Sequence, residues 1–200
     1  MDKEKVRHEI IAILQPHYPE MQVRLENYSE DPSKIAIFFV DPKYALLYPM
    51  QRFHYLSHLI PKEYQDLNLE GTVWFELAPG EGPGDLRFPD EDLIAEITHD
   101  VMKCVLAAEV LEALDNALCP NAPDAPRALC YGDYRNTKPI LLARGFAEAE
   151  LFDVFHVLMA QGGYCDCEFP YNVAEGSRLA AEYWRARADG REPYNPHKGG

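Results

Sequence analysis

Three prolines fall within the eight residues 119–126, and this segment constrains the fold of the chain more than any other. A proline inside a helix removes a backbone hydrogen bond and clashes with the preceding turn, so no helix can run through the segment. Apolar residues recur at helical spacing before it, over 91–118. We therefore predict an α/β domain over 1–118, a helical domain over 127–190 and a flexible tail over 191–200.

The segment before the prolines alternates between helix and strand patterns. Apolar residues follow a helical period over 6–14 and 50–60, whereas 21–25, 35–40 and 69–77 have the alternating or β-branched and aromatic composition of strands. These patterns predict the α+β class, with an N-terminal α-β-β-α-β-α domain whose first two strands form a hairpin. A small helical domain follows, with short helices over 137–144, 147–161 and 174–188.

The charge of the chain excludes several classes of partner. It has 33 acidic and 19 basic side chains, for a formal net charge of −14, and most of the excess lies before residue 119. A surface this negative repels phosphate groups, so we expect neither nucleic acid nor a membrane as a partner. The longest apolar run, over 35–40, is far shorter than the roughly 20 residues of a membrane span. The first residues do not resemble a signal peptide, which favours a cytoplasmic protein with reduced thiols.

The most unusual segment is Gly162-Gly163-Tyr164-Cys165-Asp166-Cys167-Glu168. Two thiols two residues apart on a turn can face one ion, and zinc prefers four ligands in a tetrahedron. Cys130 is a candidate third ligand. The sequence leaves the fourth ligand open among Asp133, His156, Asp166 and Glu168, and we name Glu168 in the predicted set. The alternatives are cysteines buried as small apolar side chains and a thiol-redox role. The neighbouring carboxylates disfavour the redox role because they make a thiolate harder to form.

A second possible cation site lies on the predicted helix over 50–60. His54 and His58 are four residues apart and so share one helix face, a spacing that lets two imidazoles bind one cation. Only Glu63, beyond Pro61, could add a third ligand nearby. The simpler interpretation places both histidines on the polar edge of the helix.

Enzyme signatures are missing from the sequence. It contains no glycine-rich nucleotide loop, no phosphate-binding loop and no nucleophile elbow. We therefore predict a binding or adaptor protein without catalytic activity, which associates with itself or a protein partner through the apolar helix over 91–118. The alternatives are a protein that binds zinc or iron through Cys130, Cys165 and Cys167, and an accessory protein in thiol or iron–sulfur handling.

Two resemblances bear on these hypotheses. Residues 4–79, with Phe39-Val40-Asp41-Pro42 and Met50-Gln51-Arg52, resemble the BolA-like proteins. That resemblance implies a small α/β domain that partners monothiol glutaredoxins in handling iron–sulfur clusters. The family's ligand histidine would directly follow the Gln-Arg pair, where this chain has Phe53. His54 stands one residue later, rotated by about 100° around the helix.

The second resemblance covers residues 128–174. The cysteine turn, Asn172-Val173 after it and Arg144-Gly145 before it resemble an uncharacterised bacterial family of unknown function that carries this signature. The family pattern also includes an upstream cysteine that Cys130 matches. A histidine often follows that cysteine closely, but none follows Cys130 here. This resemblance implies no established activity.

Overall fold

The computed structural model describes residues 3–62, 71–122, 124–174 and 176–197, and it confirms the α+β class. The chain forms two compact units, Met1–Phe88 and Pro89–Gly200. The division therefore falls at Phe88 and not in the proline-rich segment 119–126. Among the described residues, no helix combines the length and the apolar character that a membrane span requires.

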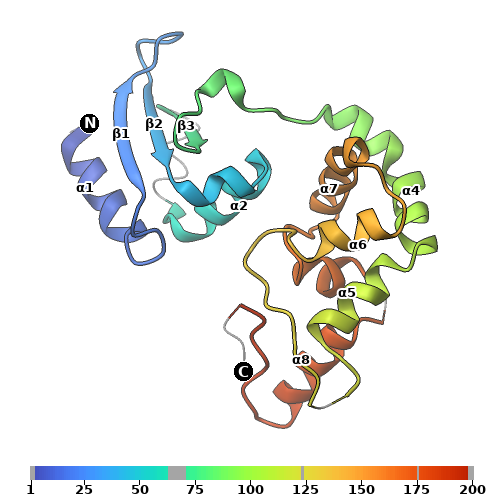
Figure 1. Ribbon diagram of the computed structural model, residues 1–200. Helices are drawn as coiled ribbons and strands as arrows, with labels where there is room; N and C mark the ends of the chain where they lie inside the picture. Colours follow the sequence, from blue (N-terminus) through green and yellow to red (C-terminus); the bar gives the residue numbers. More distant parts are fainter. Residues whose placement is uncertain (1–2, 63–70, 123, 175, 198–200) are drawn as a thin grey trace. The chain divides into compact units, whose positions relative to one another are not determined.

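The first unit is a three-stranded sheet with helices packed on it (Figure 1). Its strands lie in the order β1-β2-β3, with β1 antiparallel and β3 parallel to the central β2. The predicted hairpin is confirmed, since Leu25 pairs with Ile37. Its elements are α1 (Lys3–Leu14), β1 (Gln22–Asn27), β2 (Ile35–Val40), the 3₁₀ helix η1 (Pro42–Leu46), α2 (Pro49–Leu59), β3 (Thr72–Leu77) and the 3₁₀ helix η2 (Pro83–Asp85).

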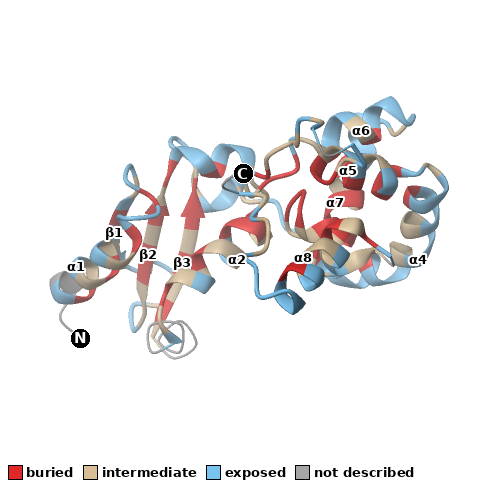
Figure 2. Cartoon of the chain, turned by 90° about the horizontal axis from the view of Figure 1, so that it is seen from below, coloured by how far each residue is buried: buried red, intermediate tan, exposed pale blue. Residues whose placement is uncertain are grey.

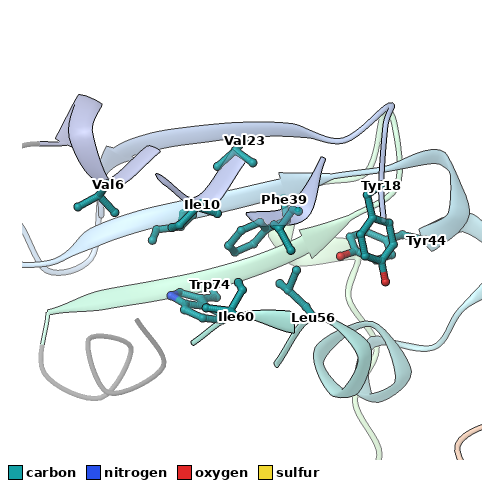
Figure 3. Packing of buried hydrophobic residues seen from close by; sticks show 11 residues of the cluster. Val6, Ile10, Tyr18, Val23, Phe39, Tyr44, Leu56, Ile60 and Trp74 are labelled. Atoms are coloured by element: carbon teal, nitrogen blue, oxygen red, sulfur yellow. The ribbon is translucent and has the colours of Figure 1, made fainter. Parts of the chain in front are cut away.

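The core of this unit forms between the apolar face of the sheet and the apolar stripes of two helices. Alternate residues of the strands point to one face of the sheet, and the apolar stripes of α1 and α2 cover that face. Phe39 lies at the centre, fully buried, with its ring 5.4 Å from the ring of Trp74 (Figure 3). The cluster also holds Val6, Ile10, Leu14, Tyr18, Val23, Ile37, Tyr44, Leu56 and Ile60.

A buried arginine joins α2 to the loop after β3. The Arg52 guanidinium forms an ion pair with Glu81 at 2.5 Å and donates to the Glu76 carbonyl at 2.8 Å. Its Nε donates to the Leu47 carbonyl at 2.9 Å. Arg52, the second residue of the Gln-Arg pair, is therefore part of the scaffold of this unit.

The second unit is helical. Its elements are α4 (Glu91–Ala107), α5 (Val110–Leu118), α6 (Thr137–Ala143), the 3₁₀ helix η3 (Glu148–Glu150), α7 (Leu151–Ala160), the π-helical turn η4 (Phe169–Val173) and α8 (Arg178–Ala188). Most of α7 is buried, as its colour in Figure 2 shows. α4 packs against α7, and α5 packs against α6.

The prediction of a single helix over 91–118 is wrong. The chain turns between α4 and α5, where Glu109 adopts a left-handed conformation with φ of 54°. This turn lets each helix place its apolar stripe on a different neighbour, which a straight rod could not do. Because those neighbours, α7 and α6, belong to the second unit, α4 and α5 belong to it as well, contrary to the predicted domain over 1–118.

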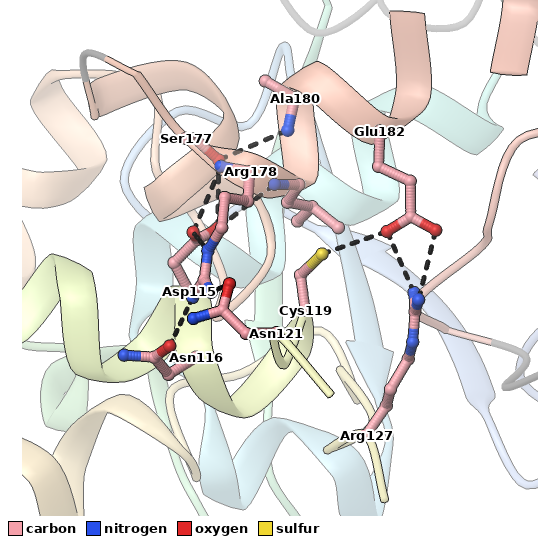
Figure 4. A network of polar contacts seen from close by, with 10 residues as sticks. Asp115, Asn116, Cys119, Asn121, Arg127, Ser177, Arg178, Ala180 and Glu182 are labelled. Atoms are coloured by element: carbon pink, nitrogen blue, oxygen red, sulfur yellow. Dashed lines mark hydrogen bonds and ion pairs between the residues drawn. The ribbon is translucent and has the colours of Figure 1, made fainter. Parts of the chain in front are cut away.

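A polar network ties α5 and the segment after it to α8 (Figure 4). The buried Asp115 carboxylate accepts hydrogen bonds from the backbone N–H groups of Arg178 and Leu179 at the start of α8. It also pairs with Arg178 Nε at 2.8 Å. Glu182 accepts from two nitrogens of Arg127, each at 3.1 Å, and from the Cys119 thiol at 3.0 Å.

Candidate metal centre

Four side chains of the second unit, each a potential metal ligand, lie close together. The Sγ atoms of Cys130, Cys165 and Cys167 and a ring nitrogen of His197 all lie within 4.8 Å of one another. Cys165 Sγ is 3.4 Å from Cys167 Sγ, which is 3.3 Å from His197 Nε2. The three thiols are buried and the imidazole is exposed. Three of these four candidate ligands, the cysteines, are residues that the sequence also brings forward as candidates.

Two glycines shape the turn that carries Cys165 and Cys167. Gly162 has a φ of 86°, a conformation that side chains disfavour, and it follows Gln161, the C-cap residue of α7. A Cβ on Gly163 would lie 3.0 Å from Phe169 Cα and 3.2 Å from a methyl group of Val173. The Gly163 carbonyl accepts from the Tyr134 hydroxyl, whose ring stacks on Phe155 of α7. The turn is therefore closely packed against the helical core.

Asp166, between the two cysteines, anchors the turn and is not in the ligand group. Its carboxylate accepts from the backbone N–H and hydroxyl of Thr137 and from the backbone and side-chain nitrogens of Asn136, at 2.7 to 3.0 Å. These donors lie at the start of α6, where a negative charge is favoured. Burial raises the pKa of Asp166 to about 6, against the effect of these hydrogen bonds.

The other candidates for the fourth ligand are also outside the group of four. Asp133 forms an ion pair with Arg135 at 2.6 Å. Glu168, the fourth ligand named in the predicted set, accepts a hydrogen bond from the backbone N–H of Tyr164 at 3.0 Å. His156 lies on α7, where its Nδ1 donates to the Phe152 carbonyl at 2.6 Å.

His197 is the candidate ligand that sequence reasoning missed, because it lies in the segment predicted to be a flexible tail. Residues 191–197 instead fold back onto the unit. The Arg191 N–H donates to the Ala186 carbonyl, and the Cys130 N–H donates to the Pro196 carbonyl at 2.9 Å. The Arg127 guanidinium lies 4.4 Å from the centre of the Tyr194 ring. Within the segment itself, the Asn195 side chain accepts a hydrogen bond from the His197 N–H, which closes a short turn.

The electrostatics of the group favour an anionic sulfur at Cys130. Hydrogen bonds from the Cys165 thiol and then the Cys167 thiol lower the pKa of Cys130 well below its usual range, and backbone N–H groups of Gly132 and Cys167 act in the same direction. As the donors to that sulfur, Cys165 and Cys167 have raised pKa values. Together the thiols form a compact set of soft donors, to which a cation could bind in place of the shared protons.

The two remaining cysteines are separate from this group. Burial and the Glu182 carboxylate raise the pKa of Cys119 to about 11, so that thiol stays protonated. Cys104 is exposed on α4.

The structure places His54 and His58 side by side on α2, with ring centres 4.4 Å apart. His58 Nδ1 donates to the His54 carbonyl at 2.7 Å. In the described part of the chain, no third ligand joins them in a metal-binding group, and Glu63 lies outside that part.

Comparisons with family models, curated proteins and solved structures find no match for this chain. Both family resemblances stay predictions, and the functional argument rests on the site itself.

Proposed function

We propose that the second unit is a zinc-binding domain in which Cys130, Cys165, Cys167 and His197 bind one Zn²⁺ ion. The observation that carries this proposal is the convergence of three thiols and one imidazole, within 4.8 Å, from three separate parts of the chain. Three cysteines and one histidine are an established ligand set for structural zinc. Iron is the alternative metal, and the same thiols could bind it.

The ion would have a structural role. Four protein ligands complete a tetrahedron and leave no position for a substrate, in contrast to catalytic zinc sites. The ligands join the segment before α6, the turn after α7 and the C-terminal segment. Metal binding would therefore fasten the C-terminal segment to the helices, and its binding energy would add to the stability of the unit.

Elemental analysis of the full chain, purified without added metal, tests the proposal. We expect one zinc ion per chain, and its loss in Cys165→Ser. The matched control is Cys104→Ser, which removes an exposed thiol outside the site and should retain zinc. Iron in place of zinc, with visible absorption, would assign the alternative metal. Substoichiometric zinc and iron, with all five thiols freely titratable, would refute metal binding.

A further inference from the structure

A small pocket lies next to the proposed zinc site, between η4, α8 and the C-terminal segment. Its volume is about 100 Å³, and its wall is mostly carbon. That volume is well below the roughly 300 Å³ of the smallest typical cofactor sites, so it suits a single chemical group. The residues that matter to the argument are Tyr171, Leu179, Tyr183, Tyr194, Glu168 and Glu182.

The tyrosines indicate what kind of group fits. Tyr171 and Tyr183 both line the pocket, and their rings are in edge-to-face contact, with centres 5.6 Å apart and planes at 87°. Tyr194 adds a third ring, which already lies against a cation, the Arg127 guanidinium. Aromatic faces attract cations, and sets of such rings recognise quaternary and methylated ammonium groups.

The carboxylates of the pocket agree with a positive ligand. Glu182 is balanced by its two hydrogen bonds to Arg127. Glu168, whose Oε2 accepts from the Tyr164 N–H, contributes a second carboxylate to the lining. A cation with a carbon surface suits both the apolar wall and a lining that contains two carboxylates. We propose that the pocket binds a methylated ammonium group, carried by a small molecule or by a methylated lysine side chain.

The proposed zinc site would help to build this pocket, and to that extent the inference rests on the proposed function. Tyr194 and Pro196 line the pocket, and both belong to the segment that His197 would tether to the metal. Cys167 contributes to the pocket and to the ligand group. Removing the metal should therefore loosen one wall of the pocket and weaken ligand binding.

The probe is choline, titrated into the zinc-loaded full chain by calorimetry. Its neutral isostere, 3,3-dimethyl-1-butanol, has the same shape without the charge. We expect choline to bind at least about tenfold more tightly than the isostere, and Tyr183→Leu to lose about tenfold in choline affinity. Tyr28→Leu, in the first unit, is the matched control and should bind choline as the unaltered chain does. Chelation of the metal should weaken choline binding.

A peptide containing trimethyl-lysine separates the two sources of the ligand. Tighter binding of the peptide than of choline would assign a modified protein, and the reverse would assign a small molecule. Zinc content is measured on the same samples. If zinc is stoichiometric but choline does not bind, or binds no better than its isostere, the pocket proposal is refuted while the zinc proposal stands. If zinc is absent, the zinc measurement refutes the proposed function independently of the choline result.

Discussion

Glu76 is a buried carboxyl group on β3 of the first unit, 6% exposed. Burial raises its pKa to about 7, although the Arg52 charge acts in the opposite direction. The folded chain therefore binds a proton that the unfolded chain releases near pH 4. The bound proton stabilises the folded state fully below about pH 4. This stabilisation, about 3 kcal/mol in the free energy of unfolding, is lost as the pH rises through 7.

We predict that Glu76→Gln, which removes this titration, gains stability relative to the unaltered chain as the pH rises from 5 to 8. Urea unfolding followed by Trp74 fluorescence, in a Trp184→Phe background, measures the first unit selectively. Parallel pH dependences of the two chains would contradict the prediction.

Asp166 and Glu168 flank Cys167 but have different roles in the structure. Because Asp166 positions the turn through its bonds to Asn136 and Thr137, Asp166→Ala should lower zinc affinity by about 10- to 100-fold, as typical for residues that orient metal ligands. Glu168→Gln should retain one zinc ion. Competition with a chromophoric chelator measures both affinities, and zinc loss in Glu168→Gln alone would show that the carboxylate is a ligand.

At the scale of elements, the turn after α7 depends on close packing at Gly163. The extra methyl group of Gly163→Ala would overlap the backbone of η4 and should destabilise the second unit by about 1–3 kcal/mol. Gly84→Ala is the control, since a Cβ there would meet no atom within 4 Å. Urea unfolding followed by Trp184 fluorescence, in a Trp74→Phe background, provides the measurement. Equal midpoints for the two variants would contradict the packing argument.

The elements also show how far local patterns reach. The hairpin and α2 are predictable because their apolar periodicities match the faces they bury. The break at Glu109 is not, because the apolar stripe over 91–118 continues through it. The stripe is shared between two neighbours, and only their positions show where the helix must turn. Self-association through this segment stays a prediction, since Leu93 and Leu106 of α4 are exposed.

At the scale of the molecule, the C-terminal segment should depend on the metal for its position. A chain truncated after Asp189 lacks His197 and keeps the three thiols, so its zinc affinity should fall at least about tenfold, the effect of losing one of four ligands. A chain lacking only residues 198–200 is the control and should keep full affinity. In the full chain, chelation should expose residues 190–197 to proteases. Equal zinc affinities of the two truncated chains would exclude His197 as a ligand.

The sequence by itself determined the α+β class, the order of elements up to β3, and three thiols as candidate ligands, because each depends on residues close together in the chain. The tertiary structure alone decided the division at Phe88, the turn at Glu109 and the approach of His197 to the thiols. His197 follows Cys167 by 30 residues, and no local pattern connects them. Their meeting depends on how α8 packs and on where the segment after it returns, which are properties of the folded unit.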